Sequence, residues 1–214
     1  MIRLKNLAIA GLLAATLFAG ATASFAEPAD NAAQSRAGDQ VAGKYESSLC
    51  KGCHGAEGTS FVDLIPNLAG QNSGYIAKQL RDLQSGARTH QIMSAISRSI
   101  TATELADISA YFAGLKIMQG DGGGDNPAAE KLFRNGDSAR GIPACAGCHG
   151  EKGKAPVKPN YPVIGGQHGE YLRVQLFHFR GGDRSNSPDG IMSKAVMKLT
   201  DNEIDALSVY LSGR

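Results

Sequence analysis

The sequence predicts an all-α protein that contains two tandem copies of one small helical domain. Five blocks of sequence recur in order along the chain, first at a spacing of 96 residues and then at 99. Apolar residues recur at helical spacing behind helix-capping residues in both copies, and the period-two patterns of strands are weak. The expected domains cover residues 27–118 and 127–214, joined by a flexible Gly-rich linker at 119–126.

The N-terminal residues 1–26 have the pattern of a secretory signal peptide. A basic start leads into an apolar stretch, residues 7–17, which is short for a membrane span. Small residues then favour cleavage after Ala26, with a cut after Ala23 as the rival and an uncleaved anchor as the alternative. Export to the periplasm is therefore expected.

Charge and composition exclude some classes of protein. The formal net charge is +2 and falls to zero once Arg3 and Lys5 leave with the signal peptide. A nucleic-acid-binding protein would show a basic excess. The chain has no Trp and only 6% aromatic residues, which is lean for two hydrophobic cores. A buried apolar cofactor in each half would supply the missing volume.

In each copy, the first expected helix leads directly into a Cys-x-x-Cys-His motif. This helix passes through Tyr45 in the first half and through residues 132–133 in the second, and the motifs are Cys50 to His54 and Cys145 to His149. Such a motif is typical of covalent attachment of c-type haem. One helical turn places two thiols three residues apart and directs the following His toward the centre of the porphyrin.

The motifs account for all four cysteines of the chain. We therefore predict two covalently bound haem c groups, each with a proximal histidine. The thioether residues are Cys50, Cys53, Cys145 and Cys148, and the proximal ligands are His54 and His149. A zinc protein built on Cys-x-x-Cys pairs is the plain alternative, but export and the His after each second Cys argue against it.

Prolines and central helices follow the motifs. Pro66 and Pro162 lie 12 and 13 residues after their histidines, where each could present a carbonyl to the second nitrogen of the imidazole. Each could equally be a simple turn former. The central helices are expected at residues 75–83 and 171–179.

The sixth iron ligand is predicted to be Met93 in the first half and Met192 in the second. Both occur in an Ile-Met-Ser sequence eight residues before a capping Thr, and a His/Met pair is the expected scheme for an electron-transfer haem. Met is otherwise most often core filler. The competitors have no counterpart in the other repeat and are expected to pack or to lie at the surface or interface: Met118, Met197, His90, His168 and His178.

The last helix of each copy begins with a capping box, formed by Thr101 with Glu104 and by Thr200 with Glu203. Two arginines and two tyrosines are also matched between the repeats and could contact haem propionates: Arg88, Arg184, Tyr75 and Tyr171. The alternative is that the arginines are solvated and the tyrosines are packed in the protein.

These motifs resemble those of the cytochrome c4 family, whose members are two fused class I cytochrome c domains. The resemblance covers essentially the whole mature chain, including Pro66-x-Leu-Ala-Gly-Gln71 and the segment from Met192 to Leu211. It implies two lobes related by pseudo-twofold symmetry, with haem propionates that face one another, and it places the axial methionines at Met93 and Met192. It also implies a carrier of electrons in a periplasmic respiratory chain, from a quinol-oxidising complex to a terminal oxidase or reductase.

The sequence therefore favours an electron carrier, not an enzyme. The expected partners are redox proteins, with the inner membrane as a possible peripheral contact and no nucleic acid. Two alternatives remain: the cytochrome subunit of a periplasmic dehydrogenase of the flavocytochrome type, and a dihaem peroxidase. A peroxidase needs a labile sixth position on one iron, which two repeat-matched methionines argue against.

Overall fold

The computed structural model describes residues 37–214, so the predicted signal peptide at residues 1–26 lies outside the described residues. Within residues 37–214 the chain is helical, and its β-structure is confined to one isolated bridge between Asp137 and Ile142. The predicted all-α class is confirmed. None of the helices in this range is long and apolar enough to cross a membrane.

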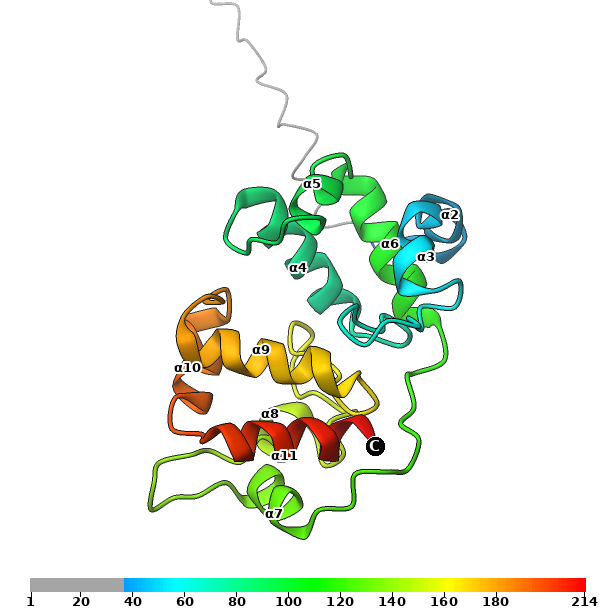
Figure 1. Ribbon diagram of the computed structural model, residues 1–214. Coiled ribbons are helices and arrows are strands. Elements are labelled where there is room, and N and C mark those ends of the chain that lie inside the picture. The colour runs from blue at the N-terminus through cyan, green and yellow to red at the C-terminus, as the bar shows by residue number, and fades with distance from the viewer. Residues whose placement is uncertain (1–36) are drawn as a thin grey trace, which may run out of the picture.

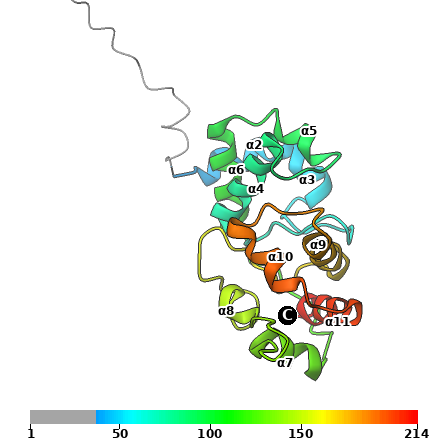
Figure 2. The ribbon, with the colours of Figure 1, turned by 90° about the vertical axis from the view of Figure 1, so that its left-hand side faces the viewer.

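The helices form two lobes that lie one above the other in Figures 1 and 2. The first lobe comprises α2 (Gln40–Glu46), α3 (Ser48–His54), α4 (Ser73–Ser85), α5 (Met93–Ser97) and α6 (Ala102–Gly114). The second lobe comprises α7 (Pro127–Asn135), α8 (Ala146–His149), α9 (Gly169–Gly181), the 3₁₀ turn η1 (Pro188–Gly190), α10 (Ile191–Val196) and α11 (Asp201–Ser212). Helices α2 to α6 correspond in order to α7, α8, α9, α10 and α11, as the repeat predicts.

Local capping explains where several helices begin. Asp39 accepts hydrogen bonds from the first turn of α2, and Asn126 does the same for α7 ahead of a favourable Pro127. Both predicted capping boxes are present. The Thr101 and Thr200 hydroxyls each accept from an N–H of the first turn while the glutamate three residues later accepts from the cap's own N–H.

Each lobe has its own hydrophobic core, formed mainly by its central and last helices. In the first lobe the core includes Phe112 at 0% exposure, and in the second it includes Phe133, also at 0%. Two partly buried residues adjoin each core: Cys50 and Met93 in the first lobe, and Cys145 and Met192 in the second. The cores therefore bring each attachment motif and the methionine predicted to be its partner to the same apolar surface.

The expected flexible linker is held by the C-terminus. The Gly120 N–H donates to the Arg214 carbonyl at 2.7 Å, and the Gly122 N–H donates to Gly213 at 3.2 Å. Gly124 has φ +72°, and a Cβ there would lie 2.2 Å from the Val209 carbonyl oxygen. Glycine is needed here because the segment runs against α11, whereas composition alone suggested freedom.

The capping box of the second lobe carries an added ion pair that predicts a pH effect. Glu203 binds Arg140, which lowers the pKa of the carboxyl, and the Thr200 bonds lower it further; Glu104 has its pKa lowered by Thr101 alone. Glu203→Gln is therefore expected to destabilise the protein at pH 7 by less than about 1 kcal/mol because the pair is partly exposed, and by more than Glu104→Gln does.

The sign of the pH dependence follows from the direction of the shift. A lowered pKa contributes stability above the unfolded-state value of about 4.3 and loses it as pH falls through the folded-state value. The difference between the wild type and Glu203→Gln should therefore shrink below about pH 4. Urea unfolding of both proteins at pH 7 and pH 3 measures this difference in the free energy of unfolding. If the difference is the same at both pH values, the stabilising role assigned to the ionised Glu203 carboxylate is wrong.

Candidate haem sites

The two Cys-x-x-Cys-His motifs lie on short helical turns. In the second, the Cys148 and His149 N–H groups donate to the Cys145 carbonyl at 3.1 and 3.0 Å. None of the four cysteines forms a disulfide, and burial raises the pKa of the Cys145 thiol to about 11 and shifts that of Cys50 in the same direction. The four sulfur atoms are thus available for thioether bonds.

A glycine follows each motif because the chain must turn sharply there. Gly55 and Gly150 have φ values of +83° and +82°. A Cβ at these positions would lie 1.9 Å from the Thr59 carbonyl oxygen and 2.5 Å from that of Ala155. The turn redirects the loop back across the motif, toward the proline that contacts the histidine.

The histidines of both motifs, which the sequence predicts to be the proximal ligands, are buried at 6% exposure, and each is oriented by one carbonyl. His54 Nδ1 donates to the Pro66 oxygen at 2.8 Å, and His149 Nδ1 donates to Pro162 at 3.0 Å. These bonds confirm the role predicted for the two prolines. Since a carbonyl only accepts, Nδ1 carries the proton and Nε2 is left to bind a metal. Burial also lowers the pKa of both imidazoles, which favours the neutral form that a metal requires.

The methionine candidates separate by position. Met93 begins α5 and Met192 lies in α10, and both are partly buried against the cores that also contact Cys50 and Cys145. Met197 is 59% exposed, whereas Met118 is 3% exposed and contacts Gln167.

The spare histidines lie at the surface or at the interface between the lobes, as the sequence predicts. His90 is exposed and accepts from the N–H groups of Ile92 and Met93. His178 is exposed, and His168 contacts the Ser60 carbonyl of the other lobe at 3.1 Å.

This set of donors fits covalently bound haem. Each lobe presents the two cysteines of a motif and an imidazole with a fixed tautomer, and it places the first of these cysteines and a methionine thioether against one apolar core. A small cavity next to Cys50 has a mixed lining of apolar and polar side chains: Leu49, Ile96, Ile100, Ile108, Glu46, Ser99 and Glu104. Within residues 37–214 no three His, Cys, Asp or Glu side chains come together as a metal site.

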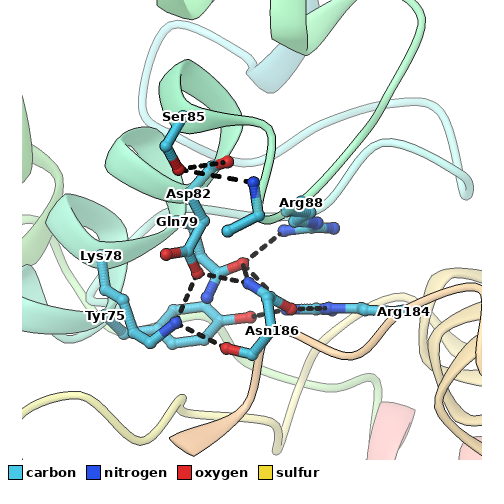
Figure 3. Close-up of polar contacts among 9 residues, drawn as sticks. Tyr75, Lys78, Gln79, Asp82, Ser85, Arg88, Arg184 and Asn186 are labelled. Carbon is cyan, nitrogen blue, oxygen red and sulfur yellow. Dashed lines mark hydrogen bonds and ion pairs between the residues drawn. The ribbon is translucent and has the colours of Figure 1, made fainter.

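The lobes meet through a buried polar network of repeat-matched residues (Figure 3). Arg184 donates to Tyr75 at 3.1 Å and to Gln79 at 2.9 Å, while Arg88 donates to Gln79 at 2.8 Å. The matching contacts of Arg88 with Tyr171 and Gln175 complete an approximate twofold arrangement.

Sequence reasoning singled out the two arginines and two tyrosines of this network but not the glutamines. Arg184 is only 7% exposed, so the alternative of a solvated arginine is wrong for this residue. The signal for the glutamines was present, because Gln79 and Gln175 are matched at a spacing of 96 residues. A repeat-matched polar residue on a helix with an apolar stripe indicates a surface shared by the two copies.

The network departs from symmetry on one side. Asn186, in the segment that carries the three-residue insertion of the second repeat, donates to Gln79 at 3.0 Å and to Asp82. Lys78 pairs with Asp82 and donates to the Asn186 carbonyl at 2.6 Å. The positions of Lys78 and Asp82 are occupied in the second repeat by Val174 and His178, so this ion pair exists in one lobe alone among the described residues.

Comparison with known proteins places this architecture in one family. Residues 128–214 match the family model described as cytochrome c. A cytochrome c4 of Pseudomonas aeruginosa is 41% identical over 83% of this chain and 89% of that protein. A thiosulfate dehydrogenase electron acceptor of Thiomonas intermedia is 33% identical over 79% of this chain and 80% of that protein.

A solved structure agrees with the sequence comparison. The crystal structure of reduced cytochrome c4 from Pseudomonas stutzeri superimposes with a TM-score of 0.76 at 36% identity, and covers 83% of this chain and 99% of that one. The likeness thus extends along nearly the whole described length and covers both lobes. The chain belongs to the cytochrome c4 family of electron-transfer proteins, which carry two covalently bound haem c groups.

Proposed function

We propose that this chain is a periplasmic electron carrier of a respiratory chain, with residues 27–118 and 127–214 as its two haem domains and residues 1–26 as its export signal. It would accept electrons from a quinol-oxidising complex or a similar donor and deliver them to a terminal oxidase or reductase. One observation carries the proposal. Each lobe places the first cysteine of its motif and a methionine thioether at one apolar core, and orients the neutral imidazole of that motif with a proline carbonyl.

The proposed roles of the residues follow from this geometry. Cys50 and Cys53 hold the first haem and Cys145 and Cys148 hold the second. When bound, each haem c takes up and releases one electron as its iron changes between the ferric and ferrous states.

The axial positions go to His54 with Met93 and to His149 with Met192. The carbonyl bonds hold each imidazole plane in place and make Nε2 more basic. The methionine thioethers favour the ferrous state, and the apolar cores keep water from the iron.

A second candidate function is supported by one relative. The similarity to a thiosulfate dehydrogenase electron acceptor favours a role as the dedicated acceptor of a periplasmic dehydrogenase. The two functions differ in the donor. Stopped-flow reduction of the purified holoprotein by membranes with quinol, compared with reduction by thiosulfate plus periplasmic extract, distinguishes them.

The carrier proposal is tested first by a visible spectrum of the oxidised and reduced protein and by a pyridine haemochrome assay. We expect two haem c groups per chain, a far-red band from methionine bound to ferric iron, and no change with carbon monoxide. One haem without that band, or a spectrum altered by carbon monoxide, would overturn the electron-carrier assignment in favour of a catalytic site. Peroxide turnover would then identify a peroxidase.

A further inference from the structure

Each proximal histidine is linked to the opposite lobe through a single peptide group. His54 Nδ1 donates to the Pro66 carbonyl at 2.8 Å. The N–H of that same peptide belongs to Asn67, and it donates to Oε1 of Gln167 in the second lobe at 2.8 Å. The connection therefore runs from the imidazole, through one conjugated peptide, to a side chain on the other side of the interface.

The second lobe repeats this connection with the roles of the two lobes exchanged. His149 Nδ1 donates to Pro162, and the N–H of the same peptide, at Val163, donates to Oε1 of Gln71 at 2.8 Å. Gln71 and Gln167 are matched at a spacing of 96 residues. Each glutamine thus acts across the interface, on the histidine of the lobe to which it does not belong.

Both glutamines are rigidly held. Gln71 Oε1 also accepts from the Asn72 N–H at 2.9 Å, and its Nε2 donates to the Val163 carbonyl at 2.8 Å. Gln167 makes the same two contacts, with His168 N–H at 3.0 Å and the Asn67 carbonyl at 2.9 Å. Both side chains are 3% exposed. In such a dry environment hydrogen bonds are electrostatically strong and polarise their neighbours.

The direction of the effect follows from amide conjugation. An N–H that donates to a strong acceptor leaves more electron density on the carbonyl oxygen of the same peptide. The oxygen then accepts more strongly from Nδ1–H, and the imidazole becomes a stronger donor to iron. A stronger histidine donor favours the ferric state and lowers the reduction potential.

We propose that Gln167 sets the reduction potential of the haem in the first lobe and that Gln71 sets that of the haem in the second. Both are positioning residues that act through a peptide and the proximal histidine. The proposal rests on the assignment of His54 and His149 as axial ligands.

The test uses full-length holoprotein in which the two potentials are measured separately. A redox titration followed by NMR resonances assigned to each lobe gives one potential per lobe. Gln167→Met removes the acceptor at similar volume and should raise the potential of the first-lobe haem. Gln71→Met should raise that of the second. We expect a change of about three- to tenfold in the ratio of reduced to oxidised haem at fixed potential, where tenfold equals about 59 mV for one electron.

Two further variants separate tuning from loss of structure. Gln167→Glu keeps an acceptor of greater strength, so it should lower the potential of the first-lobe haem more than that of the second. Asn186→Ala removes an interface contact that does not touch either peptide, so neither lobe should shift selectively. If Gln167→Met does not fold, Gln167→Glu carries the test alone.

The crossed pattern is the decisive result. A shift confined to the lobe that bears the substitution, an equal shift of both haems, or no shift would overturn the proposal. The haem content and far-red band of the same samples report the axial ligands independently. A failed ligand assignment would change the spectrum of the wild type, whereas a failed tuning role would leave every spectrum intact.

Discussion

Met192→Ala is expected to abolish the far-red band of the second haem and to make that haem bind carbon monoxide. In the proposed ligand scheme, removal of the thioether would leave the iron with His149 and an open position, and the iron would lose the ligand that favours the ferrous state. The potential of this haem should fall by about 0.1 V or more, within the range of ~0.8 V that axial ligands span.

Met197→Ala is the matched control because it removes the same side chain five residues away. Met192 is partly buried beside the core that contacts Cys145, whereas Met197 is 59% exposed. Met197→Ala should leave the spectrum and the potential unchanged. Difference spectra with and without carbon monoxide provide the measurement, and loss of the band in Met197→Ala would transfer the ligand role to that residue.

The local parts of the fold could be predicted because the same sequence patterns occur in both repeats. Thr101 with Glu104 and Thr200 with Glu203 form capping boxes as expected. The central helices, expected at residues 75–83 and 171–179, lie within α4 and α9. Capping and helical periodicity depend on neighbours three or four residues away, and the second repeat is an independent check on the first.

The contacts between the lobes could not be predicted in this way. Gln71 and Gln167 join segments 92 and 100 residues apart, and no local pattern encodes their partners. The peptide groups that contain the Pro66 and Pro162 carbonyls take part in both kinds of contact, the local kind that could be predicted and the kind between lobes that could not. Their carbonyl bonds to the histidines follow from the general rule that a metal-binding histidine donates its other ring N–H to a carbonyl or carboxylate. The contacts of the two glutamines become visible only when both copies are placed in space. The hydrogen bonds from Gly120 and Gly122 of the linker to the C-terminal residues also could not be predicted from a local pattern.

Gly43→Ala is expected to destabilise the first lobe by about 2 kcal/mol or more, because the new side chain would overpack a close helix crossing. Gly43 lies in α2 against α6, and a Cβ would lie 2.0 Å from the Asp107 carbonyl oxygen and 2.4 Å from its carbon. The main chain of α6 cannot yield locally, so the two helices must separate. The gain in helix propensity, about 1 kcal/mol, does not offset this.

Gly181→Ala provides the contrasting case, since Gly181 is also a helical residue, at the end of α9, but faces open space. The nearest atom to a Cβ there is a carboxylate oxygen of Asp183 at 3.7 Å. This variant should be neutral or slightly more stable. Thermal unfolding followed by circular dichroism and by lobe-assigned NMR signals would show loss of the first lobe ahead of the second in Gly43→Ala. Equal stability of the two variants would mean that α2 can shift without cost, and that the close approach of α2 and α6 contributes little to holding the motif at Cys50 in place.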